Sequence, residues 1–163
     1  MALQSITSLA TITLQQATST VTFSGITNTY RDLILAIDHT VSVAANKLVR
    51  FNNDEGSNYP WIYMGGNGSS PLTGINTSTS LLVEAVAAGS ATERLLTVVN
   101  ILDYSATDKH KTALVRNGRA SQGTDLIVSR WANTNAISTI SIGLNNSASF
   151  TAGSTFSLYG RIA

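Results

Sequence analysis

The side chains that could perform catalysis are few, and they do not form a recognisable motif. The chain has two histidines, His39 and His110, and no cysteine. A nucleophilic triad places its serine on a sharp turn, as in the G-x-S-x-G pattern, which the sequence lacks. The segment Gly66-Asn67-Gly68-Ser69-Ser70 lacks both the Lys-Ser/Thr end of a phosphate-binding loop and the third glycine of a dinucleotide fingerprint. The sequence therefore predicts a protein that is not an enzyme and that holds no cofactor.

Oxygen-bearing side chains are concentrated between residues 52 and 58. Asn52, Asp54 and Glu55 could offer the oxygen ligands that Ca²⁺ prefers, but their spacing does not match an EF-hand loop and no bidentate glutamate follows. Asn and Asp in such a run more often fold a turn by bonding their own backbone. We therefore expect no metal site, and these three residues are its only weak candidates.

Three aromatic residues, Tyr59, Trp61 and Tyr63, alternate directly after this polar segment. A strand would place all three rings on one face, because side chains alternate between faces. Such a row could stack on sugar rings. It could equally fill the core or an interface with another protein, where Trp and Tyr are enriched. The row is therefore a candidate for partner or glycan contact, and the core or interface is the favoured alternative.

A basic excess lies between residues 109 and 130. Its cations are opposed only by Asp125, and the residues are Lys109, Lys111, Arg116, Arg119 and Arg130. A site for single-stranded nucleic acid would interleave aromatic rings, which are absent here. The net charge of +1 also provides no general attraction for nucleic acid or an anionic membrane. We expect this stretch to be exposed, as a solvated loop or a docking patch for an acidic protein.

The elements that must position these residues are predicted to be strands. Only 12% of the residues are charged, and Ser, Thr and Asn provide much of the remaining polarity, which is typical of strands and turns. The run 95–102 is the most hydrophobic and predicts a central strand. Further strands are predicted over 33–37, 48–51, 112–115, 126–128, 140–144 and 156–162.

Breaks rich in Gly, Asn and Ser separate these strands, and their density predicts an all-β, antiparallel, jelly-roll-like β-sandwich. Asn117-Gly118 is a candidate hairpin turn, because both residues tolerate a positive φ. Segment 81–88 could be a short helix, but a strand or loop is favoured. Residues 1–20 are either an extended arm that pairs with a neighbouring sheet or an ordinary first strand, and 21–163 form one sandwich domain.

Charged residues are absent from three long stretches, 1–30, 56–83 and 131–160. Charge is depleted at the centres of protein interfaces, so these stretches are predicted to be surfaces buried against other chains. No apolar run is long enough for a transmembrane helix, and no Lys or Arg precedes residue 31 as a secretory signal requires. We therefore expect no contact with a membrane.

Nine short segments of the chain form a recognisable set. They are Phe23, Tyr30–Leu33, Arg50–Asp54, Asn58–Tyr59, Asp103–Tyr104, Lys109–Thr112, Trp131, Ile137–Ile140 and Ser157–Gly160. Together they resemble a family of small virion proteins encoded by tailed phages. The family usually has Phe-Asn-Gly-Asp where this chain has Asn53 in place of the glycine, and asparagine is the best substitute at a left-handed turn position. The resemblance implies a β-sandwich virion component without catalytic residues.

The favoured function is that of a capsid decoration (cement) protein. Such a protein would be made in the host cytoplasm and would bind neighbouring major capsid subunits on the capsid surface, as a homotrimer, through many weak contacts. The alternative is a carbohydrate-binding, receptor-binding module of a tail fibre or tail tip, which would use Tyr59, Trp61 and Tyr63. Either way, the partners are other virion proteins or a glycan.

Overall fold

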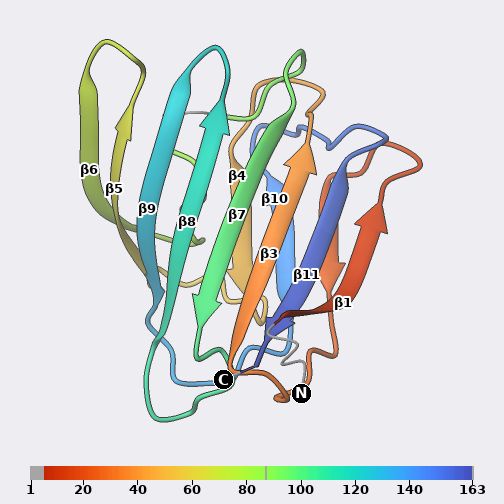
Figure 1. Ribbon diagram of the computed structural model, residues 1–163, viewed down its shortest axis with the longest axis vertical. Coiled ribbons are helices and arrows are strands. Elements are labelled where there is room, and N and C mark those ends of the chain that lie inside the picture. Colours follow the sequence, from red (N-terminus) through yellow and green to blue (C-terminus); the bar gives the residue numbers. More distant parts are fainter. Residues whose placement is uncertain (1–5, 87, 163) are drawn as a thin grey trace.

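The computed structural model describes residues 6–86 and 88–162. Within them the regular secondary structure consists of strands alone, so no helix there could cross a membrane. Eleven strands form two antiparallel sheets (Figure 1). The large sheet has the order β1-β11-β3-β7-β8-β9-β5-β6, and the small sheet has the order β2-β10-β4. The predicted all-β sandwich is confirmed, with its strands divided eight and three between the sheets.

Along each strand of the large sheet, successive side chains point alternately to a buried inner face and to an outer face. In chain order the bounds of all strands are β1 (Ile6–Thr13), β2 (Thr20–Phe23), β3 (Asp32–His39), β4 (Lys47–Phe51), β5 (Tyr59–Gly66), β6 (Pro71–Ser78), β7 (Leu95–Leu102), β8 (Lys111–Arg119), β9 (Gly123–Trp131), β10 (Ile140–Leu144) and β11 (Thr155–Arg161). The run 95–102 is confirmed as a central strand, because β7 pairs with β3 on one side and β8 on the other. Strand β6 was not expected, since its sequence contains Pro71, Gly74 and few apolar residues.

The N-terminal segment contains a strand of the sandwich itself. Strand β1 pairs with β11 along the edge of the large sheet, with a bulge between Ser8 and Ala10. Residues 6–13 are therefore an ordinary first strand of this chain's own sheet, and not an arm that pairs with a neighbouring molecule. Residues 1–5 of the predicted arm lie outside the described residues.

The turn predicted at Asn117-Gly118 is wrong, because both residues lie inside β8. The Asn117 side chain is buried, where its Oδ1 accepts a hydrogen bond from Thr97 and its Nδ2 donates one to Asp125. The chain instead reverses over residues 120–122, after which Gly123 begins β9 with a φ of 129°. Strand pairing on both sides of β8 therefore outweighs the local preference for a turn.

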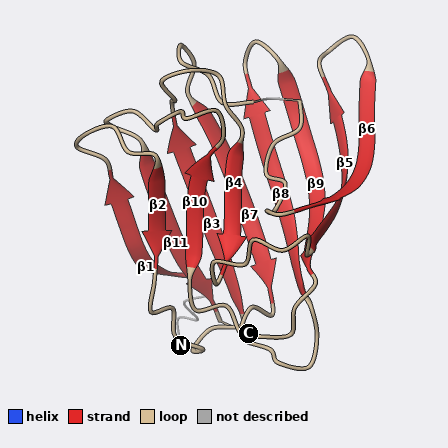
Figure 2. Ribbon diagram, turned by 180° about the vertical axis from the view of Figure 1, so that it is seen from behind, coloured by secondary structure: helices blue, strands red, loops and turns tan. Residues whose placement is uncertain are grey.

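The small sheet covers only part of the inner face of the large sheet. Figure 2 shows β2, β10 and β4 lying over β11, β3 and β7, while β5 and β6 lie beyond them. Between the two layers lies a core of aliphatic and aromatic side chains, including Leu35, Val99, Phe156, Ile140 and Phe51. Figures 1 and 2 together show the second layer ending beneath the middle of the large sheet.

The connection between β6 and β7 extends this second layer beneath β8 and β9. Its residues Leu81 and Val83 are fully buried, and the Leu81 backbone N–H donates to the Val49 carbonyl on β4. Asp125 on β9 accepts hydrogen bonds from the backbone N–H groups of Ala85 and Val86. The alternative of a helix over 81–88 is not found in residues 81–86 and 88, because hydrogen bonds to β4 and β9 hold this backbone against the two sheets.

A buried ion pair fastens this connection to the small sheet. Lys47 on β4 and Glu84 are both almost fully buried, and the Lys47 ammonium donates a hydrogen bond to Glu84 Oε2. Glu84 Oε1 also accepts from the Lys47 backbone N–H. Burial lowers the pKa of Lys47, and the attraction of Glu84 opposes that effect. Removing one partner of such a pair leaves a buried charge without its counter-ion.

We expect Glu84→Gln to lower the free energy of unfolding by about 3 kcal/mol, because it strands the Lys47 charge in the core. The double variant Lys47→Met/Glu84→Gln should be more stable than Glu84→Gln alone, since it removes both charges and retains an oxygen that can accept from the backbone at residue 47. Urea denaturation of the wild type and the two variants measures both differences. Equal stabilities for the single and double variants would show that the pair is not coupled.

Candidate functional site

The polar segment 52–58 is an internally bonded turn. Asp54 Oδ2 accepts hydrogen bonds from Trp131 Nε1 at 2.7 Å and from Asn58 Nδ2 at 2.9 Å. Asp54 Oδ1 accepts from the backbone N–H of Gly56 at 2.8 Å. Burial acts to raise the pKa of Asp54, but these three hydrogen bonds outweigh it and hold the pKa below its usual value. The carboxylate thus joins the β4–β5 turn to the end of β9.

The other weak metal candidates are also engaged. Asn52 Oδ1 accepts from the backbone N–H groups of Ser138 and Thr139, and Glu55 lies 3.3 Å from an Arg50 guanidinium nitrogen. Asn53 adopts a φ of 57°, which confirms the predicted left-handed position. Among the described residues no group of three or more His, Asp or Glu side chains could hold a metal ion.

The aromatic row is divided between the core and the surface. Tyr59 is fully buried, where its hydroxyl donates to the Asp54 carbonyl and accepts from the Phe51 N–H. Burial raises the pKa of Tyr59 to about 12. Trp61 and Tyr63 are half-buried, with ring centroids 6.0 Å apart and ring planes inclined at 42°. Tyr59 therefore cannot contact a partner or glycan, and only Trp61 and Tyr63 remain available.

The expectation of an exposed basic stretch from 109 to 130 is wrong for two of its members. Lys111 is fully buried, and its Nζ donates to the backbone carbonyls of Lys109 and Thr134. Burial lowers the pKa of Lys111. The Arg119 side chain is only 11% exposed and forms an ion pair with Glu93. The strand alternation of β8 turns these side chains away from Arg116, so no single basic patch forms.

Lys109 is exposed at the end of the molecule where the chain enters β8. Its Nζ lies 3.1 Å from Asp103 Oδ2, so a counter-ion is already present. The hydrogen bond from Lys109 is the largest of the effects that lower the pKa of Asp103. Lys109 thus lies outside the sheet face that carries Arg116.

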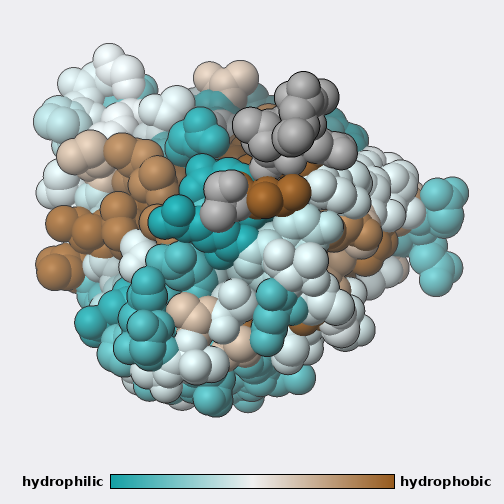
Figure 3. Space-filling view, turned by 60° about the horizontal axis from the view of Figure 1, so that its bottom comes forward, coloured by the Kyte–Doolittle hydropathy of each residue, from teal (hydrophilic) through white to brown (hydrophobic). Residues whose placement is uncertain are grey.

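An apolar surface lies on the outer side of the large sheet, and we call it the outer face. It is formed by exposed side chains on three adjacent strands: Ile62 and Met64 of β5, Ile75 of β6, and Leu126 and Val128 of β9. The strand pairs place Ile62 beside both Ile75 and Val128, and Met64 beside Leu126. In Figure 3 hydrophobic side chains gather on the side of the molecule where Figure 1 shows β5 and β6.

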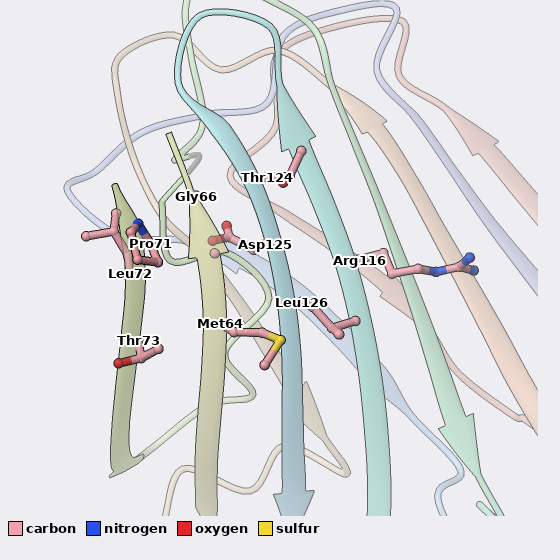
Figure 4. A pocket seen from close by; sticks show the side chains of 10 residues that line it. Met64, Gly66, Pro71, Leu72, Thr73, Arg116, Thr124, Asp125 and Leu126 are labelled. Carbon is pink, nitrogen blue, oxygen red and sulfur yellow. The ribbon is translucent and has the colours of Figure 1, made fainter. Parts of the chain in front are cut away.

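Two arginines border the outer face on β8 and β9. Arg116 pairs with Leu126 across the strands, and Arg130 lies two residues beyond Val128 on the same side. Both are exposed, and neither forms an ion pair or side-chain hydrogen bond with any described residue. Figure 4 shows Met64 and Leu126 close together while Arg116 extends toward β7. A shallow depression of ≈ 510 Å³ lies among these side chains.

Runs of consecutive apolar residues are the sequence signal that marks this surface. Residues 126–128 are all apolar, and so are Trp61, Ile62, Tyr63 and Met64. Consecutive apolar residues in a strand require both faces to be covered, whereas only the inner face has a second layer. The outer face is therefore an apolar surface that the chain itself leaves in contact with solvent.

Two of the three uncharged stretches, 131–160 and 56–83, have different explanations. Stretch 131–160 contributes Ile137, Ile140, Phe150 and Phe156 to the core, so its lack of charge reflects burial within this chain. Stretch 56–83 contains β5 and β6, which carry exposed residues on the outer face. Stretch 56–83 therefore forms exposed surface that carries no charge, whereas stretch 131–160 supplies residues of the core.

One titratable cluster lies inside the sandwich. His39 is fully buried beside Lys47, with 3.3 Å between its Nε2 and the Lys47 Nζ, and its ring packs edge-on against Phe150. Burial and then the Lys47 charge lower the pKa of His39 to about 3. A substrate cannot reach this cluster, because Lys47, Glu84 and His39 are all at most 3% exposed.

The comparisons with known proteins add no relative. No protein-family model matches the chain, and neither a curated protein nor a solved structure matches it.

We expect His39 to make the fold acid-sensitive. Between pH 6.5 and about 3, His39 is protonated in the unfolded chain but stays neutral in the folded chain. The free energy of unfolding is therefore highest above pH 6.5 and falls as the pH decreases through this range. At pH 5 the loss is up to about 2 kcal/mol. Urea denaturation at pH 7.5 and 5.0 should show a smaller loss for His39→Leu than for the wild type.

The exposed His110 provides the matched control. His110→Leu should lose as much stability on acidification as the wild type does. An identical pH dependence for His39→Leu and the wild type would contradict the assignment.

Proposed function

We propose that this chain is a structural protein of a tailed-phage particle. Its favoured role is that of a capsid decoration protein, which binds neighbouring major capsid subunits and holds the shell together. The proposal combines the resemblance of its sequence segments to small virion proteins with the presence of an uncovered binding surface.

The observation that carries the proposal is the outer face. Its five apolar side chains are each at least 41% exposed and lie side by side on a rigid sheet. Contiguous exposed apolar surface of this kind marks protein-interaction sites. Arg116 and Arg130, which lack partners within the described chain, add the residue type most enriched at such interfaces. A shell subunit with apolar and acidic side chains would complement this surface.

The segments behind the family resemblance support the fold and not the contact surface. Phe51 packs edge-on against Trp131, and its ring lies 6.2 Å from that of Tyr59. The Tyr104 hydroxyl donates to the Thr27 carbonyl and accepts from the Tyr30 N–H. These residues join loops to strands inside the sandwich. They are consistent with a shared architecture whose particle-binding residues lie elsewhere.

Purified phage particles should contain this chain in hundreds of copies, and particles made without it should lose their genome at a lower temperature. Added wild-type protein should restore heat resistance, whereas Leu126→Glu should not, because a carboxylate is placed in the centre of the outer face. Quantitative mass spectrometry and a thermal-release assay measure these outcomes.

Gln122→Glu serves as the control, since residue 122 is exposed in the turn between β8 and β9 and does not line the depression among Met64, Leu126 and Arg116. It should restore heat resistance as the wild type does. Absence from purified capsids, or equal heat resistance with and without the chain, would disprove the role.

A second function is favoured by a separate observation. Trp61 and Tyr63 present partly exposed rings on the inner side of β5, beyond the small sheet, and two neighbouring rings can hold a sugar by stacking. This supports a carbohydrate-binding module of a tail fibre or tail tip.

If the chain binds glycans, Trp61→Ala should abolish glycan-array signals while the fold remains intact by circular dichroism. Ile62→Ala, which alters the opposite side of the same strand, should leave the signals unchanged. An array on which the wild type binds nothing would exclude this function and leave the decoration role unaffected.

A further inference from the structure

Strand β6 is an edge of the large sheet that lacks the usual protection against pairing with another strand. It pairs with β5 over its full length, from Pro71 to Ser78, without a bulge, and no strand among residues 6–86 and 88–162 pairs with its other side. Natural edge strands are commonly blunted by lysines, prolines or bulges. Strand β6 has no charged residue, and its single proline is at its first position. The opposite edge, β1, carries a bulge.

The hairpin formed by β5 and β6 carries apolar or aromatic side chains on both sides. Ile62 and Ile75 are 54% and 80% exposed on the outer side, and the half-buried rings of Trp61 and Tyr63 lie on the inner side. The small sheet ends before it reaches this hairpin (Figure 2). The chain therefore supplies neither a neighbouring strand nor a full second layer at this edge.

The distribution of charged side chains indicates which molecule can pair with this edge. Residues 56–83 contain no charged side chain, so two copies of the hairpin can approach each other without like-charge repulsion. Two outer faces brought together would instead place Arg116 and Arg130 opposite their own copies, and no exposed carboxylate lies on strands β5 to β9 to offset them. The edge suits self-association, whereas the outer face suits a different protein.

We propose that β6 of one molecule pairs antiparallel with β6 of a second copy of this chain. The two strands are related by a two-fold axis, because such a contact uses the same surface on both partners. The two large sheets then become one continuous sheet, and the unpaired backbone groups of both β6 strands are satisfied. The product is a dimer, in place of the homotrimer expected from the sequence. This inference does not depend on the proposed function.

Light scattering coupled to size-exclusion chromatography tests the contact on the wild-type chain. A mass of twice 17.2 kDa is expected for the wild type, and 17.2 kDa for Thr73→Lys/Ile75→Lys. Both positions are exposed on β6, so the monomer should keep its fold while the added lysines repel each other across the pairing. Leu96→Lys, at an apolar side chain 55% exposed on β7, should remain a dimer.

Hydrogen exchange on the unmodified protein provides an independent measurement. Amides of β6 should exchange several-fold more slowly at high protein concentration than at low, while those of the edge strand β1 should not change. A wild-type monomer or trimer, a dimer that survives Thr73→Lys/Ile75→Lys, or β6 amides indifferent to concentration would overturn the proposal.

Discussion

The structure depends on one imbalance: a sheet of eight strands must bury one face, and only three strands are available to cover it. A sheet with an uncovered apolar inner face would not be stable, because burial of that face is the main favourable term in folding. The chain solves this by folding the connection between β6 and β7 back under β8 and β9. Leu81 and Val83 of that connection then complete the core.

This solution places charges inside a protein that has few of them. Several charged side chains are buried, and they bind one another or the backbone of loops whose polar groups have no strand partner, among them Lys47, Glu84, Asp125 and Lys111. A loop segment carries unpaired backbone groups, and buried carboxylates and ammonium groups satisfy several of them at once. The charges used here are missing from the surface. Much of the exposed surface therefore consists of neutral polar groups and, on the outer face, of apolar side chains.

The residues that look most distinctive in the sequence serve the architecture. Asp54 joins a turn to Trp131, and Tyr59 fills the core behind it. A site for a partner is better sought among ordinary aliphatic residues such as Ile62 and Leu126, whose importance lies in where the strand pairs bring them together. In this molecule a surface, and not a motif, is the feature that points to function.

The sequence by itself determined the fold class and the central strand 95–102, because alternation and turn preferences act over a few neighbouring residues. The left-handed turn at Asn53 was expected from the family resemblance, in which glycine stands at this position. It indicated the aromatic row without separating Tyr59 from Trp61 and Tyr63. Only the tertiary structure decided that Lys111 is buried, that Asn117 lies within a strand and that β6 forms an edge. Those outcomes depend on which strand lies beside each residue, and pairings between distant segments leave no local trace in the sequence.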